Sequence, residues 1–446
     1  MLGIIPVLCF VVFVVTYAVI CRDRGALTRW RASFLSAAVT WGLTVTAITE
    51  LLSPFRLITF DWLLTLWVGV FLLSTAICFT FTVSTREKLT GLFQFPHIPR
   101  LEFWCVPAVI SIVSMVGLVA FAAPPNNADS MTYHMPRVMH WIQNQTVAHY
   151  PTNILRQLFR PPWSGFAIMQ FQVLSDGDQW ANLVQWFSMF GSVVGVSLIA
   201  KQLGADTRGQ VLAAVIAVTI PMGILQASST QNDYVTAFWL VCLVHYILRF
   251  KKQPRWANAV AVGASLALAL LAKGTAYLYA FPLLAWFALS ALKNLGGRAW
   301  QPLLAIAAIV LTVNLGHHTR NFDLWGHPLV VDIDSPFVNK VFSVPVILSN
   351  VIRNMSLHVG TPSSRVNGWI HAGIRAVHVP LGISPSDPRT TANAERRFYQ
   401  RPFSRHEDSA GNPFHLALII GGIAFVFLSR KLGARITRLP FGSRPG

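Results

Sequence analysis

Eleven long apolar windows constrain the chain more than any other feature, because about 20 mainly apolar residues span a bilayer as a helix. Only 12% of the residues are charged, about half the share of a soluble domain, and so few charges cannot cover a water-facing surface. Since lipid cannot satisfy free backbone groups, we predict an all-α polytopic membrane protein with about 11 transmembrane helices. The windows are 4–20, 34–52, 60–83, 103–123, 181–200, 211–227, 235–250, 257–272, 276–292, 302–316 and 414–429.

The net charge of +18 follows the predicted topology. With the N-terminus outside, 20 of the 35 lysines and arginines fall in short cytoplasmic connections and the tail, and two fall in short outer connections. The other 13 lie in two long outer segments, which the positive-inside rule does not count. The basicity therefore indicates a multi-pass topology with a cytoplasmic C-terminus rather than a nucleic-acid partner, and the expected partners are membrane lipids. Because the chain is compact and its outer loops carry no cysteine, we expect the inner (cell) membrane.

Four regions follow from this pattern. We expect three N-terminal membrane helices in 1–102, a membrane core in 103–316, an outer segment in 317–413, and a last helix with a basic tail in 414–446. The core contains an outer loop, 124–180, in which apolar residues recur at helical spacing, so we expect short amphipathic helices at the membrane surface. The segment 317–413 is long enough for a small outer lid with one amphipathic helix near 343–359.

The first candidate site follows the fourth apolar window. Asp129 precedes Tyr133, His134, Arg137 and His140 in the loop sequence ADSMTYHMPRVMH. An aspartate at the start of a helix has a plain reading as an N-terminal cap. The functional reading is a general base at the water–lipid boundary, with basic neighbours for an anion.

The second candidate is Asp233, in the sequence Gln231-Asn232-Asp233 at the outer end of the next helix pair. A polar turn between two membrane helices has the same appearance. Its depth, however, matches that of Asp129, and two carboxylates at one level can share a metal ion or a substrate hydroxyl. A divalent metal on Asp129, Asp233 and His134 is therefore one hypothesis, and no other cofactor is indicated.

Basic residues interrupt the later windows. Lys273 lies in the turn LAKGTA, and it is either a snorkelling lysine or a cation for a lipid-linked phosphate. Arg320 and Asn321 follow His317-His318 at the end of the tenth window, and an arginine suits bidentate phosphate recognition. Adjacent histidines do not share a helix face, so a histidine-only metal site is disfavoured.

A last charged cluster, Arg405-His406-Glu407-Asp408, precedes the final window. It is interpreted either as a charged cluster next to a membrane helix or as part of a functional site. A haem protein would need paired axial ligands, and His245 is the one interior histidine of the predicted membrane helices.

With these residues in view, the chain resembles the C-type (GT-C) membrane glycosyltransferases, most closely the protein O-mannosyltransferase and lipid A aminoarabinose transferase group. The resemblance covers roughly 103–330 and rests on ADSMTYHMPR, STQNDYVTAF, LAKGTA and TRNFDLWGHPL in this order. Three features depart from the family pattern. Ser130 follows Asp129 where the family commonly has glutamate, three helices precede the matching core, and only one helix follows the outer lid.

The resemblance implies roles for these residues. Asp129 would be the catalytic carboxylate and Asp233 a second outer acid. Lys273 and Arg320 would face the phosphate, with Tyr133, His134, Arg137 and Asn321 lining the substrate site.

The implied reaction moves a monosaccharide from a polyprenyl-phosphate lipid to a hydroxyl of a glycan, lipid or protein acceptor, with inversion, on the outer face. Charge on the leaving phosphate needs stabilisation by basic residues or a divalent cation. A transporter or flippase for a lipid-linked sugar is the alternative from another class, although transporters usually place their charges near the midplane. A polysaccharide polymerase or ligase is the second alternative.

Overall fold

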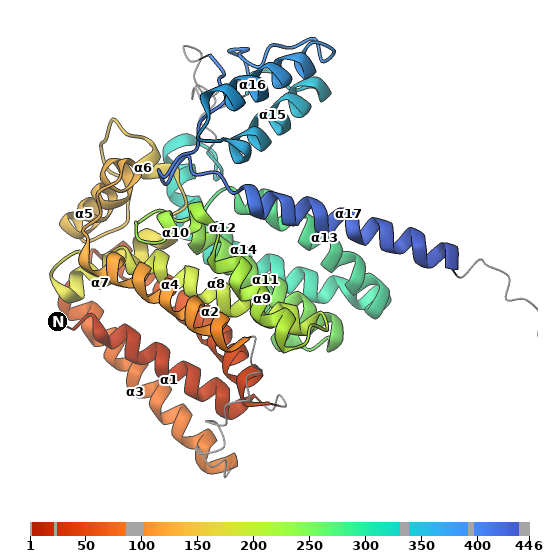
Figure 1. Ribbon diagram of the computed structural model, residues 1–446. Coiled ribbons are helices and arrows are strands. Elements are labelled where there is room, and N and C mark those ends of the chain that lie inside the picture. Colours follow the sequence, from red (N-terminus) through yellow and green to blue (C-terminus); the bar gives the residue numbers. More distant parts are fainter. Residues whose placement is uncertain (1, 22–24, 86–101, 331–338, 391–396, 437–446) are drawn as a thin grey trace, which may run out of the picture. The chain divides into compact units, whose positions relative to one another are not determined.

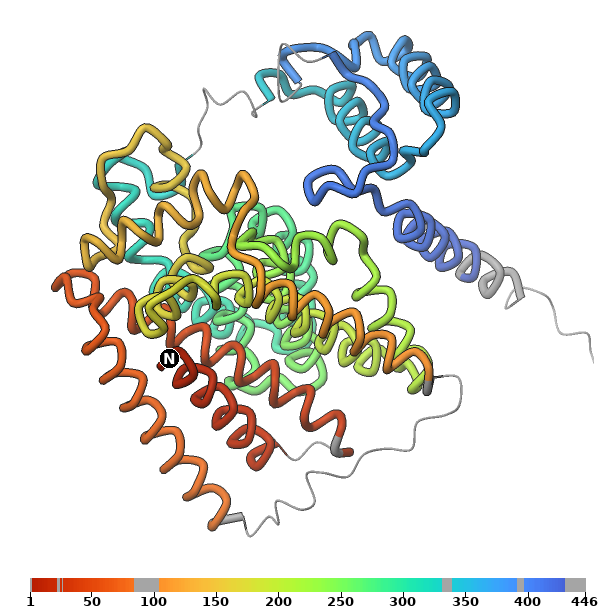
Figure 2. Tube along the Cα trace, turned by 60° about the vertical axis from the view of Figure 1, so that its left-hand side comes forward, coloured from red at the N-terminus to blue at the C-terminus, as the bar shows by residue number. Residues whose placement is uncertain are grey.

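The computed structural model describes residues 2–21, 25–85, 102–330, 339–390 and 397–436. All regular structure in these ranges is helical, with no strand (Figures 1 and 2). Helices satisfy their own backbone groups, which is the requirement that a bilayer imposes. The basic tail residues Arg438 and Arg444 and part of the predicted lid, 331–338, lie outside the described ranges.

The chain divides into two compact units. The first unit comprises residues 1–219 and 226–330, and the second comprises 220–225 and 331–446. The helices of the first unit are α1 (Ile4–Ile20), α2 (Ala26–Leu52), η1 (Ser53–Phe55), α3 (Phe60–Thr85), α4 (Glu102–Ala122), η3 (Ser130–His134), α5 (Met135–Asn144), α6 (Arg156–Phe159), α7 (Trp163–Ser175), α8 (Leu183–Gln202), α9 (Thr207–Val218), α11 (Asp233–Lys252), α12 (Trp256–Ala272), α13 (Ala276–Leu295), η4 (Gly296–Ala299) and α14 (Trp300–Trp325). The second unit contains α10 (Pro221–Gln226, except its last residue), α15 (Val344–Ser356), η5 (Leu357–Val359), α16 (Ser364–His378) and α17 (Pro413–Ile436).

Six helical runs of the described chain are long and apolar enough to cross a membrane, and four more are apolar but shorter. The multi-pass membrane class is therefore confirmed, while the count of 11 stays a prediction. The predicted windows 276–292 and 302–316 fall on α13 and α14, which are joined by η4 with a positive φ at Gly296. The window 211–227 is divided between α9 and α10 at Pro221, since proline has no N–H for the helical ladder.

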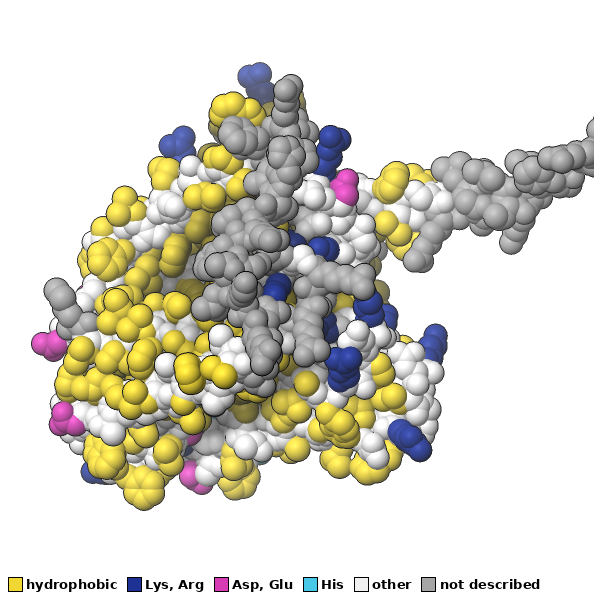
Figure 3. All heavy atoms as spheres, turned by 90° about the horizontal axis from the view of Figure 1, so that it is seen from below, with side chains coloured by type: hydrophobic (Ala, Val, Ile, Leu, Met, Phe, Trp, Pro, Cys, Tyr) yellow, Lys and Arg dark blue, Asp and Glu magenta, His cyan; other side chains and the backbone are white. Residues whose placement is uncertain are grey.

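Apolar side chains cover much of the exposed helix surface. On α3 Leu72 and Phe79 are 62% and 69% exposed, and on α4 Met115 and Leu118 are each 69% exposed. Figure 3 shows one face of the molecule, with broad hydrophobic areas between scattered charged side chains. Such surfaces are typical of helices that face lipid.

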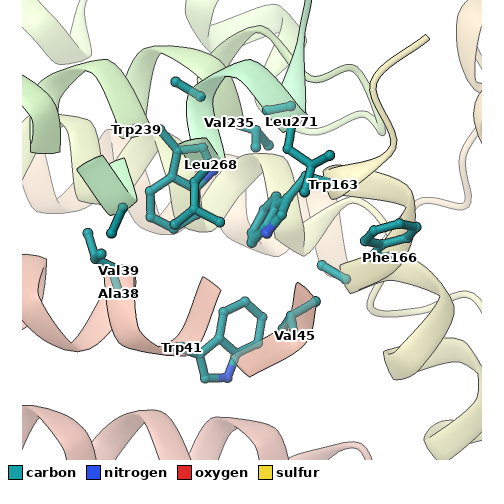
Figure 4. Close-up of a cluster of buried hydrophobic side chains, with 14 of the residues drawn as sticks. Ala38, Val39, Trp41, Val45, Trp163, Phe166, Val235, Trp239, Leu268 and Leu271 are labelled. Carbon is teal, nitrogen blue, oxygen red and sulfur yellow. The ribbon is translucent and has the colours of Figure 1, made fainter. Parts of the chain in front are cut away.

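Three tryptophans form the centre of the first unit (Figure 4). Trp41, Trp163 and Trp239 come from α2, α7 and α11, and all three are buried. Trp163 packs edge-on against Trp239 with ring centroids 4.9 Å apart, and its Nε1 donates to the carbonyl of Gly42 at 3.1 Å. A buried indole N–H usually finds such a partner, and this bond fixes the position of α7 against α2.

Helix α7 corrects one expectation about the outer loop. Surface helices were predicted throughout 124–180, yet almost every residue of α7 is buried. Its Gln170 accepts from Trp67 Nε1 at 2.9 Å and donates to the carbonyl of Val45 at 2.9 Å. α5 does have two faces, with Val138 buried and Met139 exposed. Thus α5 fits the amphipathic pattern, whereas α7 is a core helix.

The close approach of α2 to α11 gives a stability prediction. A Cβ at Gly42 would lie 2.8 Å from Trp239 Cη2 and 3.0 Å from Leu268 Cδ1. Overpacking of a well-packed core costs about 1–3 kcal/mol, more than the ~1 kcal/mol gained by replacing a helical glycine. We expect Gly42→Ala to lower the unfolding temperature of the detergent-purified protein, measured by tryptophan fluorescence.

Gly69→Ala is the matched control, because no atom lies within 4 Å of a Cβ there. Its unfolding temperature should stay equal or rise. Equal values for Gly42→Ala and wild type would contradict the packing described for α2.

Candidate active site

Asp129 lies in a distorted turn between α4 and α5. The turn η3 is a π-helix, in which the N–H of Met135 donates to the carbonyl of Ser130. Pro136 follows directly and has no N–H, so a regular α-helical ladder cannot run through this point. π-Turns of this kind are frequent at functional sites.

The carboxylate of Asp129 does not cap the helix. Asn127 takes that role, since its Oδ1 accepts from the N–H of Ser130 at 2.7 Å. Instead, Asp129 Oδ2 accepts from the hydroxyl of Tyr133 at 3.4 Å, and its Oδ1 lies 4.0 Å from Arg156 Nη1. The side chain is 40% exposed, so the carboxylate is both oriented by neighbours and open to an incoming molecule.

Two arginines cover the ring of Tyr133. The guanidinium of Arg160 lies 4.5 Å from the ring centroid and that of Arg156 lies 5.1 Å from it. Burial raises the pKa of Tyr133 to about 12, although the Arg160 charge acts in the opposite direction. The phenol therefore stays protonated and can donate to Asp129.

His134 is fully buried, and neither ring nitrogen has a hydrogen-bond partner. Burial holds the pKa of His134 well below its usual range, and Arg137, Arg160, Lys273 and Arg156 lower it further. The imidazole is therefore neutral in a cationic neighbourhood, and it offers one donor and one acceptor.

Arg137 is the most deeply placed cation of this loop, with 1% of its surface exposed. Its Nη1 donates to the carbonyl of Arg160 at 2.9 Å, and its guanidinium lies 4.9 Å from the ring of Trp141. Nε and Nη2 have no partner. Burial lowers the pKa of Arg137 to about 10, so it keeps its charge at neutral pH. A buried charge is costly unless it is paired, and an anion is the partner that would satisfy it.

Asp233 and Lys273 form an ion pair at the ends of two neighbouring helices. Lys273 Nζ donates to Asp233 Oδ1 at 2.7 Å, with 28% and 48% of the two side chains exposed. The bond from Asn232 Nδ2 to the carbonyl of Ala272, 2.7 Å long, holds the start of α11 beside the end of α12. The structure thus brings together two predicted site residues that are 40 positions apart in the sequence.

The turns of Asp129 and Asp233 are joined directly. Thr230 Oγ1 donates to Ser130 Oγ at 2.7 Å, and both hydroxyls belong to buried side chains. The charge of Lys273 also reaches His134. The term loop site refers below to these eight residues: Asp129, Tyr133, His134, Arg137, Arg156, Arg160, Asp233 and Lys273.

Arg320 pairs with a carboxylate that the sequence reasoning did not select. Its Nη1 and Nη2 each donate to one carboxylate oxygen of Glu50 at 2.8 Å. Glu50 is the one acidic residue of α2, and that isolation in an apolar helix was the signal available in the sequence. Gly316 faces this pair, and a Cβ there would overlap Glu50.

Asn321 connects α14 to the segment between α5 and α6. Its Oδ1 lies 3.1 Å from His149 Nε2, and its Nδ2 lies 3.3 Å from His317 Nε2. Burial lowers the pKa of His149 to about 4, so this contact is between neutral groups. The three polar side chains satisfy one another, and adjacent His318 takes no part in the contact.

The predicted metal ligands do not form a set. In the described ranges no group of three or more His, Cys, Asp or Glu side chains is placed to hold a metal ion. Asp233 is bound to Lys273, and His134 is surrounded by arginines. Cations, rather than carboxylates, dominate the loop site.

The cluster before the last helix lies in the second unit. His406 Nδ1 is 3.9 Å from a carboxylate oxygen of Asp408, and both side chains are mostly exposed. Exposed pairs of this kind contribute little stability, so the juxtamembrane reading is the simpler one.

The arrangement of the loop site indicates the general class of protein. Ionisable side chains that gather at the ends of apolar helices and in one loop usually mark the functional site of a membrane protein. The family comparison gives the particular relatives: residues 160–317 match the model of the dolichyl-phosphate-mannose-protein mannosyltransferase family. The match confirms the resemblance predicted from the sequence and supports a membrane glycosyltransferase of the C type. No curated protein and no solved structure matches the chain.

The Glu50–Arg320 pair gives the next prediction. The two side chains are 22% and 16% exposed, so breaking the pair leaves a partly buried charge without a partner. We expect Glu50→Gln and Arg320→Gln each to lower the unfolding temperature in detergent. The double variant should be less destabilised than the sum of the two, by about 1–3 kcal/mol. Strictly additive losses would show that the two groups do not interact.

Proposed function

We propose that the protein transfers a monosaccharide from a polyprenyl-phosphate lipid to an acceptor hydroxyl at the outer face of the inner membrane, with inversion at the anomeric carbon. The N-terminus would lie outside and the C-terminus in the cytoplasm. The observation that carries the proposal is the loop site, in which an accessible carboxylate adjoins a buried cationic cluster.

The cationic cluster supports a phosphate-bearing donor. Arg137 is buried with two guanidinium nitrogens unpartnered, and Arg156 and Arg160 flank Tyr133 beside it. Fixed cations in a place with little water stabilise charge that develops during a reaction. A departing phosphate would supply the negative charge that this cluster lacks.

Asp129 would act as the general base. Its carboxylate would accept the proton of the acceptor hydroxyl while that oxygen attacks the anomeric carbon. The bond between this carbon and the phosphate oxygen breaks, and the polyprenyl phosphate leaves with the electron pair. Attack from the face opposite the leaving group gives inversion. Tyr133 and Arg156 would keep the carboxylate pointed at the acceptor.

The remaining candidates would have supporting roles. Asp233 orients Lys273, whose half-buried ammonium would turn toward the phosphate. Arg320 is held by both oxygens of Glu50, so it would contribute charge from a fixed position. His134 would donate to the phosphate, and Asn321 would keep α14 against the loop.

The base assignment is tested by Asp129→Asn. The amide keeps the shape of the side chain but cannot accept a proton, and general-base help typically contributes 10²–10⁴-fold. We expect transfer of radiolabelled sugar from a short-chain polyprenyl-phosphate donor to fall by about 10²–10⁴-fold in proteoliposomes. The unfolding temperature should stay close to that of the wild type.

Asp178→Asn is the matched control, because Asp178 is an exposed acid of the same loop region, and it should keep full activity. Wild-type turnover by Asp129→Asn would remove the base assignment. Labelled lipid that changes leaflet without consumption of the donor would instead support a flippase.

The phosphate assignment is tested by Arg160→Gln. A charge-assisted hydrogen bond contributes about 1.5–3 kcal/mol, so its loss should raise the KM for the donor by about 10–100-fold. The KM for the acceptor should change little. Arg298→Gln, an exposed arginine of η4, is the control and should leave both constants unchanged. An unchanged donor KM in Arg160→Gln would place the phosphate elsewhere.

A further inference from the structure

Helix α15 in the second unit is amphipathic, but its buried face is mainly polar and its exposed face is mainly apolar. The residues that it buries are Val346, Ser349, Arg353 and Ser356, so three of its four buried side chains are polar. Its apolar residues face outward instead. These are Val344 (69% exposed), Ile347 (57%), Leu348 (44%), Val351 (47%) and Met355 (40%).

Helix α16 repeats the arrangement. It buries Asn367, Ile374 and His378, whereas Trp369 and Val377 are 68% and 50% exposed. α15 and α16 lie side by side in Figures 1 and 2. Together, residues 344–378 form what is named here the inverted hairpin.

The polar interior of the inverted hairpin is bonded. His378 Nε2 lies 2.9 Å from Ser349 Oγ, and Arg353 donates to the carbonyls of Pro385 at 3.1 Å and Thr390 at 2.7 Å. Gln400 Nε2 donates to the carbonyl of Ser356 at 2.8 Å. Buried polar groups that find partners make a specific interior, so the outward apolar face belongs to a well-formed packing arrangement.

Every charged residue from 339 to 386 is basic, and the carboxylate that follows, Asp387, is paired with Arg389. Residues 339–386 contain no aspartate or glutamate, and they include Lys340, Arg353, Arg365 and Arg375. Arg365 and Arg375 are exposed on α16. A helix with an exposed apolar stripe and basic flanks binds at the surface of a bilayer that contains anionic lipid.

The hairpin is also tied to the start of an apolar helix. The N–H of Asn412 donates to His358 Nδ1 at 3.2 Å, and His358 lies in η5, directly after α15. α17 begins at Pro413 and exposes Phe414 (80%), Ile419 (60%) and Phe425 (71%). The end of α15 is therefore fixed where a lipid-facing helix begins, which favours lipid over a protein partner.

We propose that the inverted hairpin lies in the headgroup layer of the membrane, with its apolar stripe among the acyl chains and its two exposed arginines, Arg365 and Arg375, on anionic headgroups. Insertion would remove the apolar surface of the stripe from water, which favours binding. The second unit would thereby be held flat on the bilayer at the base of α17. The binding requires no glycosyl transfer, so it stands or falls independently of the function proposed above.

Site-directed spin labelling tests the proposal on the full chain. Labels are placed at Ile347→Cys and Trp369→Cys in a variant without the five native cysteines, with Ser384→Cys as an exposed control from a polar loop of the same unit. Vesicles contain phosphatidylcholine with or without phosphatidylglycerol. We expect oxygen to reach the two hairpin labels and a water-soluble nickel complex to be excluded, with the reverse at Ser384→Cys. Arg365→Gln with Arg375→Gln should reduce this difference only in the anionic vesicles.

The other outcomes overturn the proposal. Access of the nickel complex to the hairpin labels would place the stripe in water, and exclusion of both reagents would place it against protein. A photo-crosslinker at Ile347 in the otherwise native chain provides a second measurement if the cysteine-free variant does not fold. Adducts with lipid support the proposal, and adducts with peptide, from this chain or a second copy, refute it.

Discussion

Burying a polar group is costly unless it is hydrogen-bonded, and bonds between buried polar groups fix how several helices of both units pack. In the first unit the indole of Trp163 donates to Gly42, and the amide of Gln170 joins α7 to α2 and α3. These bonds hold α7 within the core. In the second unit the same requirement is met by a polar interior around His378 and Arg353, which leaves the apolar side chains outside. Buried hydrogen bonds thus join helices of an apolar core in the first unit, whereas in the second unit they form the interior itself.

The loop site departs from the requirement at one place. Arg137 keeps its charge at 1% exposure without a carboxylate partner in the described chain, and His134 beside it has no hydrogen bond. Two other cations are paired with a carboxylate, Lys273 with Asp233 in the same site and Arg320 with Glu50 outside it. An incomplete set of bonds beside an accessible carboxylate is typical of a binding site, since ligand atoms supply the missing partners. This contrast, rather than the number of basic residues, distinguishes the loop site from the other charged clusters.

Local patterns in the sequence predicted the helices and the neighbours of Asp129, because both depend on residues a few positions apart. The pair of Asp233 with Lys273 and the pair of Glu50 with Arg320 join residues 40 and 270 positions apart, so they depend on how helices cross. The burial of α7 was missed for a related reason. A run of 13 residues is too short to span a bilayer, and its partners Gly42 and Trp239 lie on distant helices. Arg156 and Arg160 were passed over although RQLFRPPW holds both, since only the fold places them over Tyr133.

The family match begins at Arg160 and ends at His317, so it omits Asp129 and the three N-terminal helices. The structure nevertheless joins both omitted parts to the matched segment. Ser130 bonds to Thr230, Tyr133 lies under Arg160, and Glu50 of α2 holds Arg320 just beyond the end of the match. α2 also contacts α7, α8, α11, α12 and α14, and Gly42 provides the space in which Trp239 packs. The N-terminal helices are therefore structural members of the core. A chain without them would lose the partner of Arg320 and the anchor of α7, and with these the fixed position of the loop that carries Asp129.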